Sequence, residues 1–388
     1  AKEITEAQYK DFYPTVSHDG GEPLAWKHSH VEGSQEFWTL VYVPAKAPFN
    51  IWQNDRITGL KLYVKKVFIM DDCKDLLPPW LRFVRGVVDS EDLPLNVSRE
   101  ILQSNKIITT IRKNVIKNVL DMLSEIKEKD REKYEAWWRE LGMVLKEGFY
   151  MNWEHLDELK KLTLFKSSKS GDKFTSLDEY VKNMPKEQKE IYFLIGENKD
   201  AVATSPILEA YRNRNFEVLL LSDPIDEFMM NSLTEFDGKK FHDISRGDVD
   251  FEKTEEEKKS EEASKAEYKD LCAELQKDLD ANIKEVRVSS RLKDSPCCLV
   301  TDESAMSHHM ERMMAAMGQG VTKSKRILEI NPEHPICKML KDKASKKEPL
   351  EDWPKALYGQ ALLAEGSQLE NPAAYVQAIN KLLSAQIH

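Results

Sequence analysis

An arginine at the start of an expected helix is the residue of this sequence best suited to chemistry. Arg99 follows an acidic, proline-containing stretch, and Gln103 lies one turn later. A guanidinium is always charged and offers a planar fork of donors that suits a phosphate. An arginine that reaches into the nucleotide site of another domain can stabilise charge developing on a γ-phosphate. The alternative is a surface ion pair with Glu100 or Asp92, which the usual exposure of arginine favours.

A long amphipathic helix would position this arginine. Asn96 and Ser98 can each accept hydrogen bonds from the free amides of a first turn, so either can be the N-cap. The apolar residues that follow recur at spacings of three, four and seven, which is typical of one helical face. They are Ile101, Ile108, Ile111, Val115, Val119 and Met122. The loop would therefore present Arg99 and Gln103 away from the scaffold.

The stretch Leu-Pro-Leu-Asn-Val-Ser-Arg-Glu-Ile-Leu-Gln at residues 93–103 resembles the catalytic loop of the heat-shock protein 90 chaperones. Other runs resemble the same family in the same order, and together they cover nearly the whole chain. They lie at residues 47–49, 60–72, 81–86, 223–227 and 235–238. The resemblance implies that Arg99 is the catalytic arginine and that Gln103 supports it. It also implies that Asn96 and Glu100 orient the loop.

The resemblance further implies that ATP and Mg are bound mainly by an amino-terminal domain. The ATP-lid glycines and nucleotide contacts of that domain have no counterpart in this sequence, and residues 318–320 are too short a glycine pair for a phosphate loop. We therefore expect middle and carboxy-terminal domains only. We also expect no cofactor in this chain and no ATP hydrolysis by the chain alone.

Five methionines, Met306, Met310, Met313, Met314 and Met317, recur at the spacing of one helical face. Methionine is unbranched and polarizable and recurs on surfaces that fit many partners, although a buried core face is the alternative. The adjacent residues 308 and 309 are histidines off this stripe, which we expect to be exposed.

The resemblance implies that the first four of these methionines bind unfolded or partly folded client proteins. It assigns Glu227, Phe228 and Asn231 to a neighbouring part of the same surface. Bacterial members have tryptophan where this chain has Phe228, which weakens the assignment of that residue.

Two helices are expected at the carboxy-terminal end. Trp353-Pro354 would open the first, Gly366 would stop it, and Asn371-Pro372 would open the second. A symmetric four-helix seam between two copies would cover their apolar stripes, and packing on their own domain is the alternative. The candidate dimerisation residues are Leu357, Leu362, Tyr375, Ile379, Leu382 and Leu383.

The pattern of elements predicts an α/β fold, α+β overall. Residues 37–43 and 60–70 read as strands, 124–165 as a coil of short helices, and 191–221 as a strand–helix–strand unit with a parallel pair. Residues 252–270, rich in Glu, Lys and Ser, read as a solvated linker or exposed helix. We expect a large middle α/β subdomain with its helical coil (1–165), a small middle α/β subdomain (166–250) and an α+β dimerisation domain ending in a helical hairpin (255–388).

Composition limits the class of partner. The formal net charge of -10 argues against a general nucleic-acid binder. No apolar run approaches the ~18 residues of a membrane span, and the first residues lack a signal-peptide pattern. Five scattered cysteines indicate a reducing compartment rather than a zinc site. His28 and His30 lack a third ligand, so we expect no metal. We expect clients, a homodimer and possible cochaperones as partners, and neither nucleic acid nor membrane.

The compartment and two rival functions stay open. The chain lacks the carboxy-terminal signals of eukaryotic cytosolic and endoplasmic-reticulum members, which favours a bacterial-type cytoplasmic protein or a mitochondrial matrix relative, although the Cys297-Cys298 pair resembles eukaryotic members. One rival function is a scaffold or adaptor that binds a folded partner. Another is an autonomous enzyme, which ranks last because the sequence shows no converging catalytic residues.

Overall fold

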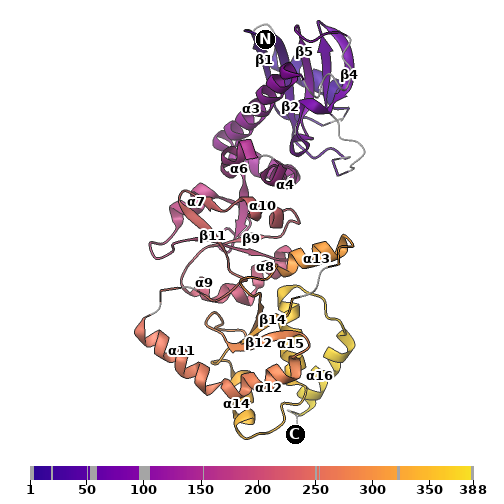
Figure 1. Cartoon of the computed structure of the whole chain (residues 1–388). Helices are drawn as coiled ribbons and strands as arrows, with labels where there is room; N and C mark the ends of the chain where they lie inside the picture. Colours follow the sequence, from indigo (N-terminus) through magenta and orange to yellow (C-terminus); the bar gives the residue numbers. More distant parts are fainter. Residues whose placement is uncertain are drawn as a thin grey trace. The chain divides into compact units, whose positions relative to one another are not determined.

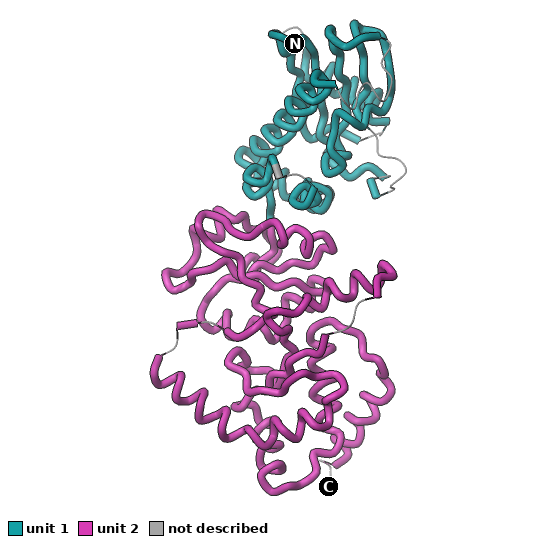
Figure 2. Tube along the Cα trace, in the orientation of Figure 1, with its two compact units in different colours: residues 1–164 teal, residues 165–388 magenta. Residues whose placement is uncertain are grey.

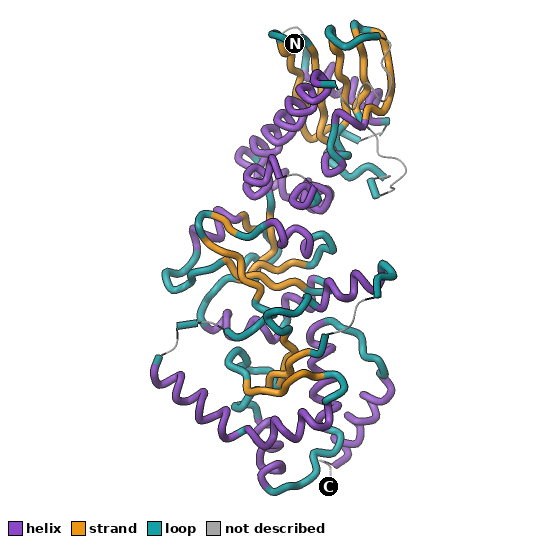
Figure 3. Tube along the Cα trace, in the orientation of Figure 1, coloured by secondary structure: helices purple, strands orange, loops and turns teal. Residues whose placement is uncertain are grey.

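A computed structural model describes residues 4–18, 21–49, 51–52, 59–95, 105–151, 153–249, 251–252, 254–320 and 324–385. The chain divides into two compact units, residues 1–164 and 165–388 (Figure 2). Each unit combines helices with sheet (Figure 3), so the expected mixed α/β fold is confirmed. The expected three-domain division stays a prediction.

The first unit contains a five-stranded sheet in the order β1-β2-β5-β3-β4 (Figure 1). Only β3 and β5 are parallel, and the other neighbouring pairs are antiparallel. The strands are β1 (Pro23–Val31), β2 (Phe37–Pro44), β3 (Leu60–Val64), β4 (Val67–Cys73) and β5 (Arg85–Ser90). The helices are α1 (Glu6–Ser17), α3 (Lys106–Lys129), α4 (Arg131–Lys146), α5 (Gly148–Met151) and α6 (Leu156–Leu162), with short 3-10 turns η2 (Lys74–Leu76), η3 (Pro79–Leu81) and η4 (Trp153–His155).

One expectation for this sheet was wrong. Residues 60–70 form two strands rather than one, because Lys65 and Lys66 both adopt positive φ, 50° and 65°, and reverse the chain. Asn or Gly usually occupies such turns, so the two lysines gave no indication of the turn in the sequence. Helix α1 and strand β1 precede β2, and β5 comes before the arginine loop.

The helix expected after the arginine loop is α3, and its apolar face is confirmed from Ile108 to Met122, where every predicted residue is buried. Its N-cap is Asn105, whose Oδ1 accepts a hydrogen bond from Ile107 N at 2.8 Å. The expected coil of short helices follows as α4, α5 and α6. Trp137 and Trp138 of α4 are buried in it.

The second unit begins with a six-stranded sheet in the order β10-β11-β8-β9-β6-β7. The predicted strand–helix–strand unit is confirmed, because β8 and β9 are parallel and are joined through helices. The strands are β6 (Leu164–Ser167), β7 (Thr175–Ser176), β8 (Ile191–Ile195), β9 (Val218–Leu221), β10 (Glu235–Phe236) and β11 (Lys239–Asp243). The helices are α7 (Leu177–Asn183), α8 (Lys199–Thr204), η5 (Pro206–Leu208), α9 (Glu209–Asn213) and α10 (Asp226–Ser232).

The rest of the second unit is a three-stranded sheet, β12-β14-β13, covered by helices. The strands are β12 (Ile283–Val288), β13 (Cys297–Val300) and β14 (Arg326–Ile330). The helices are α11 (Glu255–Glu267), α12 (Lys269–Leu279), α13 (His308–Ala316), α14 (Pro335–Ser345), α15 (Trp353–Glu365) and α16 (Pro372–Ala385). Helix α11 buries none of its residues, which confirms the expected exposed helix. Gly366 ends α15 in the left-handed region at φ 88°, as expected.

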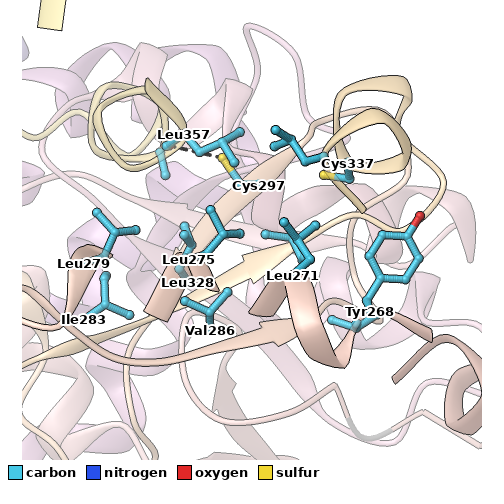
Figure 4. Close-up of a cluster of buried hydrophobic side chains, with 14 of the residues drawn as sticks. Tyr268, Leu271, Leu275, Leu279, Ile283, Val286, Cys297, Leu328, Cys337 and Leu357 are labelled. Atoms are coloured by element: carbon cyan, nitrogen blue, oxygen red, sulfur yellow. Dashed lines mark hydrogen bonds between the residues drawn. The ribbon is translucent and has the colours of Figure 1, made fainter. Parts of the chain in front are cut away.

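One face of this small sheet forms the core shown in Figure 4. Leu271, Leu275 and Leu279 of α12 lie over Val286 and Leu328 of the sheet. Cys297 also faces this core and its thiol donates to the carbonyl of Leu357 at 3.2 Å (Figure 4). Helices α12, α14 and α15 are therefore held to the strands by continuous apolar packing.

Candidate functional site

The arginine loop cannot be placed, because Asn96, Arg99, Glu100 and Gln103 lie outside the described residues. The structure does describe both flanks. Before the loop, Ser90 at the end of β5 accepts hydrogen bonds from the amides of Asp92 and Leu93, both at 3.3 Å. After it, α3 begins at Lys106. The described flanks of the loop are thus a strand end and a capped helix start.

The methionine segment is only partly helical. Helix α13 contains Met310, Met313 and Met314, whereas Met306 precedes the N-cap Ser307 and Met317 follows the last helical residue. The three helical methionines are half-buried, Met306 is 41% exposed and Met317 is 62% exposed. The expected single helical face of five methionines was therefore wrong, but the segment does present sulfur-containing apolar surface to solvent.

The side of α13 opposite the solvent is anchored by polar contacts. Glu311 is buried and accepts hydrogen bonds from the hydroxyl of Ser324 and from its amide, the latter at 3.1 Å. Arg312 Nη1 lies 2.8 Å from Glu197 Oε1, in the loop between β8 and α8.

The two histidines of α13 were expected to be exposed, and the structure shows that they are half-buried. His308 Nε2 lies 3.3 Å from the hydroxyl of Ser367. Burial, and then the nearby Arg326 guanidinium, lower the pKa of His308. His309 Nδ1 lies 3.9 Å from Glu197 Oε1. Both rings therefore face the body of the second unit, where Glu197 and Ser367 lie against α13.

The residues expected beside the methionines lie on α10, and they divide into two groups. Asn231 is exposed and Phe228 half-buried, as a surface contact requires. Glu227 is only 6% exposed, and its Oε1 accepts a hydrogen bond from the Ser307 hydroxyl. Burial raises the pKa of Glu227. The expectation that Glu227 lies on the same open surface is therefore corrected, because its carboxylate is used inside the molecule.

Some of the candidate dimerisation residues on the terminal helices α15 and α16 are buried. Leu357 is 1% exposed within the core of the second unit, and Leu382 is buried as well. Leu362, Tyr375 and Ile379 are half-buried, and Leu383 is 59% exposed. The structure adds Val376, 53% exposed, which lies on the same face of α16 as Ile379 and Leu383.

The hairpin of these two helices depends on a close approach. A Cβ at Gly359 of α15 would overlap the ring of Tyr375 on α16. The exposed Leu363 of α15 adds to the apolar surface of α16. Sequence periodicity could not separate the inner from the outer stripe, because both are apolar.

The cysteines and the histidine pair give no support for a metal site. All five cysteines are free, and burial raises the pKa of Cys337 to about 12. His28 bonds Tyr9, with Nδ1 2.9 Å from the hydroxyl. His30 does lie near two carboxylates, but its Nδ1 and Nε2 each already contact one, those of Glu32 and Glu36, at 3.1 and 3.0 Å. We interpret this group as a hydrogen-bonded surface cluster.

Comparison with known proteins identifies the family. The family model described as "Hsp90 protein" matches residues 1–388. The chain belongs to the Hsp90 family. It is 47% identical over 393 residues to the chaperone protein HtpG of Geobacter metallireducens, covering 99% of this chain and 60% of that protein. It is 46% identical over 387 residues to the HtpG of Dechloromonas aromatica, with the same coverage.

The solved structures include a matching domain of this family. The middle domain of a heat shock protein of Plasmodium falciparum matches with a TM-score of 0.57 and 36% identity, covering 63% of this chain and 96% of that domain. The chain spans about 60% of the length of these HtpG relatives. Those relatives are bacterial, and within the described part of this chain no helix has the length and apolarity to cross a membrane.

Proposed function

We propose that this chain is the client-binding and dimerising part of an Hsp90-family chaperone, and that it also supplies an arginine loop to ATP hydrolysis. The relatives are named chaperones, which implies interaction with other proteins in general. The observation that carries the proposal is the segment around α13, which exposes methionines on one side and is anchored by buried polar groups on the other. A soft apolar surface on a fixed helix suits many unfolded partners.

The client surface consists of Met306, Met310, Met313 and Met314, together with Phe228 and Asn231 of α10. Half-buried and exposed methionines can lose further water-accessible area when an unfolded segment covers them. Phe228 offers an aromatic edge and Asn231 can bond an extended backbone. Possible cochaperones would act on other surfaces.

The ATPase contribution rests on the arginine loop. When bound to the nucleotide-binding part of the longer protein, ATP with Mg supplies the γ-phosphate. Arg99 would stabilise charge on it, Gln103 would support Arg99, and Asn96 and Glu100 would orient the loop. The chain alone is proposed to lack ATPase activity.

The dimer contact uses the outward side of the helical hairpin. Val376, Ile379 and Leu383 form an apolar stripe on α16, and a second copy would complete a four-helix seam. Leu357 and Leu382 support the hairpin from inside. A cytoplasmic location in a bacterium fits the relatives, with the mitochondrial matrix as the alternative.

Client binding is tested by replacing Met310 and Met314 together with serine. We expect the affinity for a chemically unfolded model protein to fall about tenfold, because each methionine loses part of its apolar contact area. The control is Met151→Ser in the first unit, an exposed methionine outside the proposed client surface. If the double variant binds the unfolded protein as the wild type does but loses a folded partner, the scaffold function replaces the chaperone function.

The arginine loop is tested in a chain that includes the nucleotide-binding part. We expect Arg99→Ala to reduce turnover by several powers of ten while ATP affinity is unchanged. Unchanged turnover would remove the catalytic role of the loop.

A further inference from the structure

We infer that Glu227 and Ser307 act as a positioning pair that fixes the first turn of α13, so that Glu227 influences client binding without contacting the client. The inference rests on the proposed function of α13 and deepens it. It assigns to a residue of α10 control over a helix that begins 80 residues later in the sequence.

A continuous chain of hydrogen bonds connects the two helices. The Ser307 hydroxyl donates to Glu227 Oε1 and accepts from the amide of Met310 at 3.1 Å. The Ser307 carbonyl accepts from the amide of Glu311 at 3.0 Å. Ser307 therefore satisfies two amides of the first turn while its own proton is held by a carboxylate. Because a hydroxyl has a single proton, the contact with Glu227 fixes its direction and leaves its lone pairs for Met310.

Burial makes this contact specific. Both Ser307 and Glu227 are more than nine-tenths buried, so neither can exchange its partner for water without opening the site. The second oxygen of Glu227 has no hydrogen-bond partner among the residues that the structure describes. A carboxyl group is therefore retained at an unfavourable place, and the compensating interaction is with the amide end of α13, where negative charge is stabilised.

A second contact holds the same helix to the same part of the unit. Arg312 pairs with Glu197, in the loop after β8, and His309 approaches the same carboxylate. Glu197 and Glu227 both belong to the part of the unit that precedes residue 250. These contacts tie the methionines to the part of the unit that contains the six-stranded sheet, in addition to the contacts of Glu311 with Ser324 and of His308 with Ser367.

The test is hydrogen exchange of the amides of residues 310–312 in the full chain. Ser307→Ala and Glu227→Ala should each speed this exchange about fivefold, which corresponds to the roughly 1 kcal/mol of a lost N-cap. The double variant should be no faster than either single variant, because both break one chain of bonds. Ser307→Thr and Glu227→Gln keep a hydroxyl and an acceptor oxygen, so they should restore slow exchange. The control is Glu303→Ala, which removes an exposed carboxylate nearby.

Exchange and client affinity separate this inference from the proposed function. Unchanged exchange in Ser307→Ala, additive effects in the double variant, or acceleration by Glu303→Ala to the same extent would each overturn the positioning pair. Faster exchange that is not additive between the Ser307 and Glu227 variants, together with weaker client binding by these variants, supports the positioning pair. If exchange is faster and not additive but Met310→Ser leaves client affinity unchanged, the positioning pair stands and α13 is refuted as the client site.

Discussion

Replacing Glu329 by glutamine should lower the unfolding temperature of the second unit, because Glu329 accepts hydrogen bonds from a buried cluster of donors. Its Oε2 accepts from Arg291 Nε at 2.8 Å and from the Ser289 hydroxyl at 2.7 Å, and its Oε1 accepts from Arg287 Nη2 at 2.7 Å. The side chains of Arg291 and Glu329 are only 1% and 3% exposed. The other Arg291 nitrogens donate to the carbonyls of Ile244 and Gly247.

The loss of unfolding free energy depends on the Arg291 charge, which stays buried when the Glu329 carboxylate is removed. Removing one partner of a buried ion pair costs about 3–5 kcal/mol, because the other charge stays buried without compensation. Glutamine keeps the volume and one acceptor oxygen, and Arg291 keeps its two carbonyl partners, so we expect about 3 kcal/mol. For a unit of this size that loss lowers Tm by roughly 6–12 °C.

The assay is thermal unfolding followed by circular dichroism, with the unfolding of the second unit assigned by hydrogen exchange. The control is Glu333→Gln, which removes a carboxylate whose pair with Lys338 is highly exposed, and we expect it to change stability by less than about 0.5 kcal/mol. The reasoning is refuted if the Tm of Glu329→Gln lies within about 2 °C of the wild type, or if both variants lose the same amount of stability.

Acidification gives an independent check on the same residue. Burial raises the pKa of Glu329, but Arg291 and then Arg287 outweigh it, so its pKa lies below the ordinary value for glutamate. A depressed pKa contributes stability above the unfolded-state value, and this stability is lost as the pH falls through the folded-state value. The Tm difference between wild type and Glu329→Gln should therefore be constant near neutral pH and should narrow below about pH 4.

Two further predictions concern the helical hairpin. Gly359→Ala should destabilise the second unit by about 1–3 kcal/mol, because the added methyl group overlaps the ring of Tyr375, and the Tyr375→Ala background should relieve most of that loss in a thermal melt. Val376→Asp combined with Leu383→Asp should shift the dimer–monomer equilibrium toward monomer at least tenfold in sedimentation velocity while the melting temperature of the monomer is kept. If the variant with Val376→Asp and Leu383→Asp dimerises with unchanged affinity, the dimer contact lies on another surface.

Local signals made much of the second unit predictable. The stop at Gly366, which was predicted, is confirmed. The capping box of Ser176 and Glu179 and the N-cap Ser205 before Pro206 are likewise decided within a few residues. The two short apolar runs around these signals could be paired as parallel strands because a helix lies between them. Such features depend on neighbours in the sequence, so the sequence alone is enough.

Features decided by distant contacts were missed. The burial of Glu227 depends on Ser307, and the burial of His309 depends on the loop at Glu197, and neither partner is close in sequence. The inner position of Leu357 depends on Cys297. Hydrophobic periodicity identifies an apolar helix face but not what packs on it. The candidate dimerisation residues therefore included both buried and exposed residues of α15 and α16.

Packing across the expected boundary near residue 255 is likewise decided by contacts between residues distant in the sequence. Composition changes sharply there, and α11 is indeed solvated. Packing, however, continues across it, because β13 and β14 turn alternate residues to opposite faces. Cys297 and Leu328 face the core of α12 and α14, whereas Cys298 and Ile327 join a cluster with Tyr192 of β8.

The three-stranded sheet therefore contributes one face to each of two hydrophobic cores. The residues after 249 thus connect parts of the unit that already pack together. A hinge there would have to open the cluster of Cys298, Ile327 and Tyr192 and also break the bonds from Arg291 to Ile244 and Gly247. Both costs are those of core unfolding rather than of domain rotation. Because α13 is bonded to Glu227 and Glu197 on the far side of that linker, movement of the six-stranded sheet should carry the methionines with it.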